Sequence, residues 1–526
     1  METTVVSETV EMSLAISVSH RVTAPSTEHR VEPWRTPLAI IVVAGLALRV
    51  GYVSLYRHHV RLTGDAFYYH YQANLLASGK GFINPYSLYY GLKVVPGASH
   101  PPLWTLVLAL AAVVGIKTFF GQLLYSCGIG AVSVALVGMA GREVAGPRAG
   151  LIAAGITAVY PVFLIDDGSL LAETLVVPLT ALMVWAFYRL WHRPTLARAA
   201  LLGALCALAA LTRSELVLLV GFLALPAGLL LGGRSWRTRL GLCAASLIAA
   251  LCIFAPWWAY TLPRFSHPEF LSDQLGVTLA SANCNQTYHG RLLGYWSFSC
   301  AKGPIKPGED ASAADKVLRS SAIHYVEHHL DRVPVVMAAR FGRAFGVFVP
   351  WQEIDLEWAR IGRPRLPATI GLFSYYVIAV TAVGGAVVLR RRKVSLFPVA
   401  IILGEVALVA VAIFGQTRYR TPLDVVLVIL AGVALDHLRA ERSKGPGRHA
   451  TRSRGAPRPL VSAGEGSYVA PEVGPAFEAE PEVEPEVEPE VEFVDHHPPP
   501  KIGGISAAPD AGVDPSDSFW SRPKRP

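Results

Sequence analysis

Long apolar runs separated by short polar turns occupy most of the chain between residues 36 and 437. The runs lie at 36–56, 101–116, 119–140, 149–165, 170–190, 198–212, 215–231, 240–260, 367–389, 395–415 and 421–437. A helix of roughly 20 apolar residues crosses the ~30 Å hydrocarbon core of a bilayer, and a helix satisfies its own backbone hydrogen bonds in lipid. The pattern therefore predicts an all-α polytopic membrane protein.

The second run, 101–116, differs from the others. As a helix it would extend about 24 Å, short of the hydrocarbon core, and it begins with two prolines, Pro101 and Pro102. We expect this segment to lie at the membrane interface, which leaves about ten spans.

Basic residues support this count. If the N-terminus is cytoplasmic and 101–116 does not span, the arginine-rich turns between spans all face the cytoplasm, as the positive-inside rule requires. These turns carry Arg142/Arg148, Arg189/Arg193/Arg198, Arg234/Arg237/Arg239 and Arg390/Arg391/Arg392/Lys393. Were 101–116 a span, all of these residues would be exported together. We therefore expect a multi-pass plasma (cell) membrane protein with both termini in the cytoplasm.

The same topology gathers the other polar segments on the outer face. They are a first outer loop at 57–118, the Asp166-Asp167 turn, the Thr212–Glu215 turn, a long loop at 261–366, and Gln416–Arg420. Carboxylates and arginines from distant parts of the chain would then converge on one side of the membrane, as a binding or catalytic site requires.

The long loop contains two features of its own. Cys284 and Cys300 both fall in it, so in an extracytoplasmic loop they are either a disulfide or two free thiols. Residues 333–349 are apolar but interrupted by Arg340 and Arg343, a pattern that favours a helix lying on the membrane over one that crosses it.

Composition agrees with the membrane class and limits the alternatives. Of the 526 residues, 52% are hydrophobic and only 16% are charged. The net charge of +8 does not indicate nucleic-acid binding, because most arginines lie beside apolar runs. Residues 1–35 are polar, and residues 438–526 pass from a basic stretch to repeats of Pro-Glu-Val-Glu. We expect both ends to be disordered in the cytoplasm.

One carboxylate lies directly after the first apolar run. Asp65 is followed by a cluster of aromatic residues, so it lies at a bilayer surface, where a charge is costly and is commonly kept for function. The alternative is that Asp65 only caps a short interfacial helix.

Several motifs occur in a recognisable order. They are Gly64-Asp65 with Tyr69, Ala73, Leu76 and Gly79-Lys80-Gly81-Phe82, then His100-Pro101-Pro102-Leu103, Gly141-Arg142-Glu143, Ser169–Glu173, Leu211–Glu215, Pro256-Trp257-Trp258 and Arg418–Pro422. Taken together, this set resembles the GT-C membrane glycosyltransferases, in particular the family 39-like group of protein O-mannosyltransferases and lipid A aminoarabinose and galacturonate transferases. The resemblance covers residues 36–437.

The resemblance implies a GT-C-like bundle that transfers a sugar from a polyprenyl-phosphate donor to an extracytoplasmic acceptor, with inversion at the anomeric carbon. Neither the sugar nor the acceptor is indicated. Such chemistry needs a carboxylate to take or orient the acceptor proton and cations to hold the departing phosphate. Asp65 is the expected base. Because Ala66 stands where the family often has a second acid, Asp166, Asp167 and Glu173 are the substitutes.

The expected cations and hydrogen-bond donors come from three of these polar segments. They are Lys93, His100, Arg213, Arg418 and Arg420. Each has a plainer interpretation: Arg213 could simply pair with Glu215, and Arg418 and Arg420 could be ordinary interfacial arginines. A divalent metal on Asp65 is possible but not favoured, and no metal ligand is assigned.

Other functions remain as alternatives. A transporter or flippase of lipid-linked saccharides would use the same apolar groove without making a bond, but it favours ionisable residues near mid-bilayer and paired internal repeats, which the sequence does not display. A scaffold acting through the acidic tail would leave the outer carboxylates unexplained. The sequence contains no nucleotide-binding phosphate loop and no serine-nucleophile motif.

Overall fold

The computed structural model describes residues 34–56, 62–91, 94–231, 233–301 and 310–443. Regular structure in these residues is helical, apart from an isolated antiparallel bridge between Ile83 and Pro96. The all-α class predicted from the sequence is confirmed. The interpretation of residues 1–33 and 444–526 as disordered lies outside the described residues.

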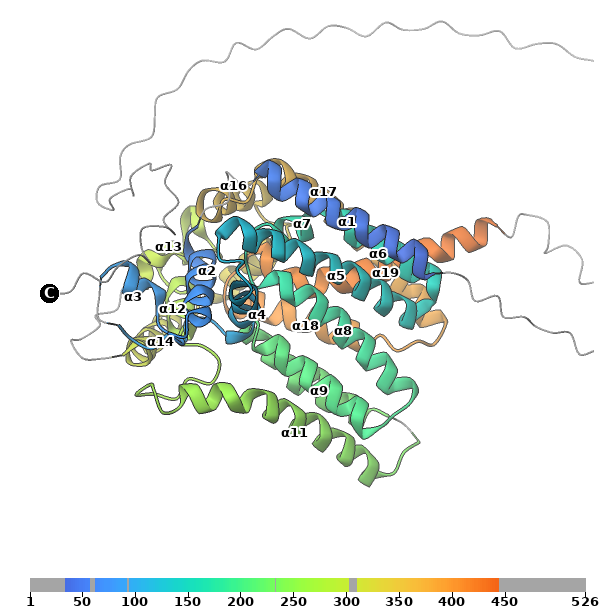
Figure 1. The fold of residues 1–526 in the computed structure, drawn as a ribbon, viewed down its shortest axis with the longest axis horizontal. Helices are drawn as coiled ribbons and strands as arrows, with labels where there is room; N and C mark the ends of the chain where they lie inside the picture. Colours follow the sequence, from blue (N-terminus) through green and yellow to red (C-terminus); the bar gives the residue numbers. More distant parts are fainter. Residues whose placement is uncertain (1–33, 57–61, 92–93, 232, 302–309, 444–526) are drawn as a thin grey trace, which may run out of the picture. The chain divides into compact units, whose positions relative to one another are not determined.

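Six helices in the described part are long and apolar enough to cross a membrane. They are α1 (Arg35–Tyr56), α5 (Phe119–Ala145), α8 (Glu173–His192), α11 (Trp236–Thr261), α17 (Arg365–Arg391) and α19 (Thr421–Arg442) (Figure 1). A seventh span is formed if α6 (Pro147–Val159) and α7 (Pro161–Asp167), which bend by 59° at Tyr160, count as one.

The remaining predicted spans are helical but short. They are α9 (Leu196–Ala210), the interrupted segment η1 (Ser214–Val217), η2 (Val220–Ala224) and α10 (Leu225–Leu229), and α18 (Phe397–Ala412). Six or seven segments therefore have the length and composition of a span, and these three shorter apolar segments are the remainder of the about ten spans that were expected. The polar Thr212-Arg213 turn ends α9 early, and the next segment is broken into 3₁₀, π and α turns.

Small residues let the long helices pack closely. A Cβ on Gly203 of α9 would overlap the Ser246 carbonyl of α11, and a Cβ on Gly385 of α17 would overlap the Leu430 carbonyl of α19. Such contacts are common between membrane helices, where van der Waals packing replaces the hydrophobic effect between helices.

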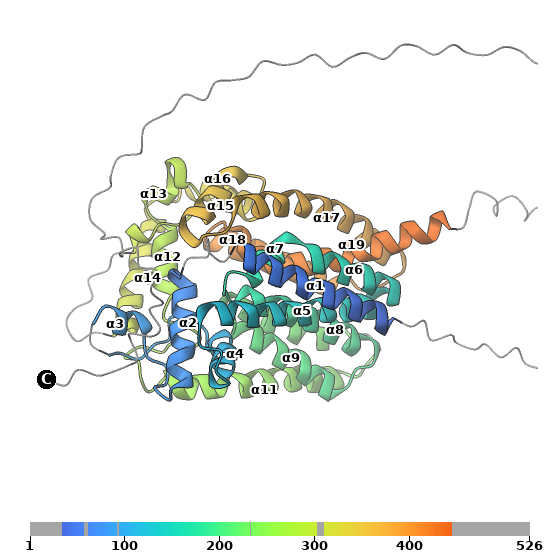
Figure 2. The same cartoon turned by 45° about the horizontal axis from the view of Figure 1, so that its top comes forward.

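The first outer loop contains short helices that run across the bundle. α2 (Gly64–Ala77) and α4 (Pro102–Val113) cross the direction of α1, α5 and α9, with α3 (Pro85–Tyr89) beside them (Figure 2). α4 has 12 residues, about 18 Å, which is too short to span. The interfacial position predicted for 101–116 agrees with this length.

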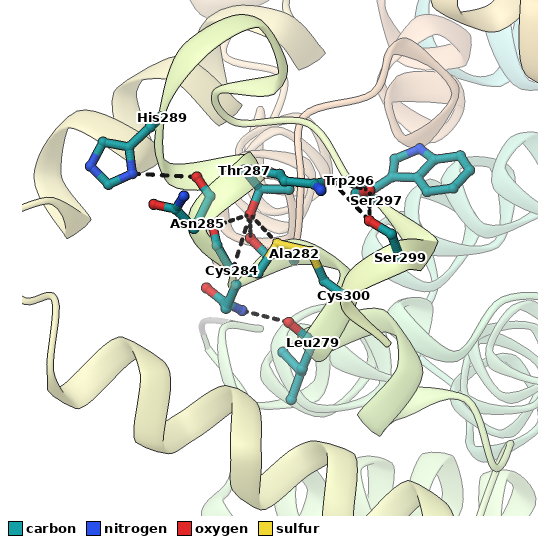
Figure 3. Close-up of a disulfide and its surroundings, with 12 residues drawn as sticks. Leu279, Ala282, Cys284, Asn285, Thr287, His289, Trp296, Ser297, Ser299 and Cys300 are labelled. Atoms are coloured by element: carbon teal, nitrogen blue, oxygen red, sulfur yellow. Dashed lines mark hydrogen bonds between the residues drawn. A yellow bond between two sulfur atoms is a disulfide. The ribbon is translucent and has the colours of Figure 1, made fainter. Parts of the chain in front are cut away.

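The long loop folds into a layer of short helices at the same end of the bundle. They are α12 (Leu275–Ala282), α13 (Asn285–Tyr288), η3 (Gly290–Leu292), η4 (Phe298–Cys300), α14 (Ala311–Glu327), α15 (Val333–Ala344) and α16 (Pro350–Ile361). A disulfide joins Cys284 and Cys300, as Figure 3 shows, and ties η4 to the start of α13. The Thr287 hydroxyl beside it donates to the Ala282 carbonyl at 2.8 Å.

The arginines that interrupt the apolar run of α15 are buried. Arg340 and Arg343 are 4% and 1% exposed and donate to partners inside the protein, while Phe341 is exposed. The prediction that this helix lies on the membrane stays a prediction. α19 continues past residue 437 to Arg442, so the prediction of a disordered tail from residue 438 is wrong for residues 438–442; in this last part of the helix His437 Nε2 lies 3.1 Å from Glu441 Oε1.

Candidate functional site

Asp65 lies in the first turn of α2, with its carboxylate 28% exposed. Thr63 is the N-cap residue of this helix, so Asp65 does not take the capping role that was the alternative. Its Oδ2 accepts a hydrogen bond from Arg418 Nη2 at 2.6 Å, and its Oδ1 lies 3.6 Å from His100 Nε2. The distant segments that the topology was expected to gather therefore meet at Asp65.

His100 is held by the aromatic residues of α2. Its ring lies 4.8 Å from the Tyr68 ring and 5.0 Å from the Tyr69 ring, centroid to centroid. The backbone before it is fixed by Gly97, where a Cβ would come within 2.8 Å of the Asn84 nitrogen. Burial is the largest influence on His100 and lowers its pKa, so the imidazole is neutral at neutral pH.

Arg418 extends the contact from Asp65 into the bundle. It belongs to the 3₁₀ turn η5 (Thr417–Arg420), and its Nε lies 3.2 Å from Glu173 Oε1. Glu173 opens α8 and is fully buried. The same Oε1 accepts from Arg213 Nη1 at 2.5 Å, and Arg213 Nε donates to Glu215 Oε1 at 2.5 Å.

These contacts form one ion-pair chain, Asp65–Arg418–Glu173–Arg213–Glu215. Three carboxylates face two guanidinium groups, so with His100 neutral the chain carries one excess negative charge. Tyr419 lies beneath it, with the Arg213 guanidinium 4.4 Å from its ring centroid. Among the residues that the structure describes, Nη1 of Arg418, Nη2 of Arg213 and Oε2 of Glu173 have no hydrogen-bond partner.

The electrostatics of Asp65 depend mainly on Arg418. Burial, the largest influence, favours the neutral acid, but the attraction of the Arg418 guanidinium and its hydrogen bond outweigh burial and hold the pKa of Asp65 well below its usual range. While this pair is intact, Asp65 is ionised but only weakly basic.

Asp166 and Asp167 do not join the ion-pair chain. Asp167 is paired with Arg49 of α1, Oδ2 to Nε at 2.7 Å, and Asp166 is paired with Arg363, Oδ1 to Nη2 at 2.7 Å. All four side chains are at most 4% exposed. They connect α7 to its neighbours, and the partner carboxylate near Asp65 is Glu173 instead.

Arg420 is also directed elsewhere. Its Nε donates to Asp424 Oδ1 at 2.9 Å, its guanidinium lies over the Tyr375 ring, and it is 2% exposed. Arg420 and Arg418 are two residues apart in a 3₁₀ turn, so their side chains leave in different directions. Lys93 lies outside the described residues.

Two residues near the site were missed from the sequence. Arg363 and Glu357, in the long loop, are both 4% exposed and are ion-paired at 3.6 Å. A loop arginine and a loop glutamate carry no periodic signal that would set them apart from surface charges. In the described residues, no group of three or more His, Cys, Asp or Glu side chains is arranged to hold a metal ion.

Comparison with known proteins adds one family. The sequence model of the Dolichyl-phosphate-mannose-protein mannosyltransferase family matches residues 99–260, less than a third of the 526 residues. The matched part includes His100, Glu173 and Arg213. The match confirms for this part the resemblance that the motifs indicated: the chain is a multi-pass membrane protein similar to the GT-C glycosyltransferases. Comparison with curated protein sequences returns no match.

Solved structures with a similar arrangement are distant. The archaeal oligosaccharyltransferase AglB from Archaeoglobus fulgidus, in complex with an inhibitory peptide and a dolichol-phosphate, is 16% identical with a TM-score of 0.45 over 80% of this chain. This chain covers 52% of AglB, about half its length. ArnT from Cupriavidus metallidurans, bound to undecaprenyl phosphate, is 14% identical with a TM-score of 0.37, over 78% of this chain and 80% of ArnT.

Proposed function

We propose that this chain is a membrane glycosyltransferase that moves a sugar from a polyprenyl-phosphate donor to an extracytoplasmic acceptor. The observation that carries the proposal is the contact between Asp65 and Arg418, which joins a partly exposed carboxylate to a cation whose Nη1 donates to none of the described residues. The family match adds support, because its description names a dolichyl-phosphate sugar donor.

The phosphate enters by exchange. The ion-pair chain carries excess negative charge, so it has no unpaired cation for an anionic phosphate. The phosphate must therefore replace the Asp65 carboxylate on Arg418, and it also contacts the free nitrogens of Arg418 and Arg213. Arginine suits this role, since its planar fork binds phosphate oxygens in pairs. Loss of the Arg418 partner raises the pKa of Asp65, so donor binding makes the carboxylate a better base.

The transfer then proceeds by direct displacement. The acceptor hydroxyl oxygen attacks the anomeric carbon, and the bond between that carbon and the phosphate oxygen breaks with its electron pair going to the phosphate. Asp65 takes the hydroxyl proton, and the two arginines stabilise the phosphate that leaves. Single displacement inverts the anomeric configuration. The free Oε2 of Glu173 is available to accept from a sugar hydroxyl.

The side of the membrane is part of the proposal. A disulfide between Cys284 and Cys300 is typical of an oxidising compartment, which supports a long loop outside the cytoplasm. The distribution of arginines among the turns points the same way. Both termini are then cytoplasmic, and the membrane is the plasma membrane.

Mass spectrometry of envelope glycans and glycoproteins tests the proposal. We compare cells that express the intact chain, cells that lack it, and cells that express Asp65→Asn. One product should be lighter by the mass of a sugar residue in cells that lack the chain and in cells that express Asp65→Asn. Identical glycans in all three samples would contradict a transferase function.

A further inference from the structure

We propose that Arg363 is a positioning residue for Arg418. It acts through Thr417 and Thr421, which lie on either side of Arg418 in the chain. This inference rests on the proposed function, because it assigns Arg418 the lipid phosphate. Arg363 follows α16, and no sequence pattern distinguishes it from the other arginines of the long loop.

Arg363 holds two carboxylates that come from different parts of the chain. Its Nη2 lies 2.7 Å from Asp166 Oδ1, at the end of α7, and its Nη1 lies 3.6 Å from Glu357 Oε2, in α16. All three residues are at most 4% exposed. A buried cation between two carboxylates resists displacement, because removal of any one member leaves an uncompensated charge.

Each carboxylate uses its other oxygen on the turn that carries Arg418. Thr417 Oγ1 donates to Glu357 Oε1 at 2.9 Å. Thr421 Oγ1 lies 3.3 Å from Asp166 Oδ2 and 2.9 Å from the Arg418 carbonyl, so its single proton serves one or the other. The residue before Arg418 is therefore hydrogen-bonded to one acid that Arg363 binds, and the residue three after Arg418 lies within hydrogen-bond distance of the other.

The rest of the turn is attached to the long loop as well. The Gly415 amide donates to the Gly294 carbonyl at 2.9 Å, and Gln416 Nε2 donates to Tyr295 Oη at 3.0 Å. Arg418 thus takes its position from the loop layer and not only from α18 and α19. The loop layer in turn depends on Arg363 for the two contacts nearest to Arg418.

This arrangement gives Asp166 a role that differs from acid–base catalysis. Asp166 contacts neither Asp65 nor His100 among the described residues, and its carboxylate is fully buried. Its effect on transfer passes through Thr421 and the Arg418 turn. A displacement of about 1 Å in a group that orients a reaction can cost up to about 100-fold in rate.

The first test removes the contacts of the Arg418 turn without changing the buried ion pairs of Arg363. Thr417→Val with Thr421→Val removes both hydroxyl contacts and leaves Arg363 with its carboxylates. We expect kcat to fall between about 10- and 100-fold, with a smaller change in KM. Arg365→Met, which removes an exposed ion pair two residues from Arg363, is the matched control and should keep its activity.

Combination with Arg418→Lys shows whether the effect passes through Arg418. Once Arg418 is replaced, the two valine substitutions should reduce kcat by less than about threefold further, because the group they position is gone. Losses that multiply in full, or no loss in the wild-type background, would overturn the positioning role.

Hydrogen exchange of the purified protein supplies a readout that needs no transfer activity. The double valine variant should exchange faster at the amides of residues 415–421, while α5 and α8 are unchanged. Unchanged exchange at 415–421 contradicts the inference even if the enzyme is active. If the wild type transfers no sugar but the exchange result holds, the proposed function fails and the positioning role stands.

Discussion

Replacement of Asp65 by asparagine removes one charge and one proton acceptor with almost no change in shape. The acceptor hydroxyl then has no carboxylate to take its proton, and general-base catalysis typically contributes about 10²- to 10⁴-fold. We therefore expect kcat of Asp65→Asn to fall by at least about 100-fold. Binding of the donor should be retained, because the substitution also frees Arg418 from its carboxylate partner.

The same substitution should cost little stability. Asp65 and Arg418 are 28% and 13% exposed, and exposed or partly exposed ion pairs contribute about 1 kcal/mol or less. Arg418 keeps Glu173 at 3.2 Å after the change, so no buried charge is left without a partner. A loss of activity without a loss of stability is thus the signature of a base at this position.

The assay uses purified protein with a polyprenyl-phosphate sugar donor, and it follows both release of polyprenyl phosphate and thermal unfolding. Asp355→Asn is the matched control, because Asp355 is a long-loop aspartate in an exposed ion pair with Arg365. It should retain activity. Full activity in Asp65→Asn would refute Asp65 as the base, and unfolding of the variant at ordinary temperature would indicate a structural role instead.

Three further predictions concern the disulfide of the long loop, two buried carboxyls of the same loop, and Arg213. Serine in place of Cys284 and Cys300 should lower the free energy of unfolding by about 3 kcal/mol, since the disulfide closes a short loop, and the intact bond should be visible as a mobility shift on a non-reducing gel. Burial, and then the charge of a neighbouring carboxylate, raises the pKa of Asp273 to about 7 and the pKa of Glu269 to about 8. Because these values lie above those of the unfolded chain, the contribution of these two carboxyls to stability is greatest below about pH 4 and is lost as the pH rises towards 8; the melting temperature of Asp273→Asn should therefore fall less over this range than that of the intact chain. Arg213→Met should weaken binding of polyprenyl phosphate at least tenfold in native mass spectrometry, and unchanged binding would remove Arg213 from the phosphate site.

The helical architecture could be predicted from the sequence because apolar length and period determine it directly. The short helix within 101–116 followed from its prolines and its limited apolar length, and its interfacial position stays a prediction. Hydropathy does not reveal where a helix stops at a polar turn, as α9 does before Arg213. Whether the helices of 196–229 cross the bilayer depends on their neighbours rather than on their own composition.

The site was predicted in part for a related reason. Asp65, His100, Glu173, Arg213 and Arg418 are polar residues at the ends of apolar runs, so topology alone brings them to one face. Topology does not tell which way a side chain turns. Asp166, Asp167 and Arg420 share that face but are each held by a buried partner of opposite charge.

The contacts of Arg363 could not be predicted from the sequence. Its importance comes from contacts with Asp166 and Glu357, which are distant in the chain or hidden in an irregular loop. No spacing rule connects such residues, and only the folded arrangement brings them together.

Sugar transfer, as opposed to transport, is tested most directly by measuring whether the bond between sugar and phosphate is broken. The purified protein is reconstituted in proteoliposomes with labelled polyprenyl-phosphate sugars and a membrane extract that supplies acceptors. We expect polyprenyl phosphate to accumulate without its sugar, the sugar to appear on an acceptor with inverted configuration, and Asp65→Asn to stop both. If the lipid-linked sugar instead reaches the opposite leaflet intact, the chain is a transporter and the proposed transfer is wrong.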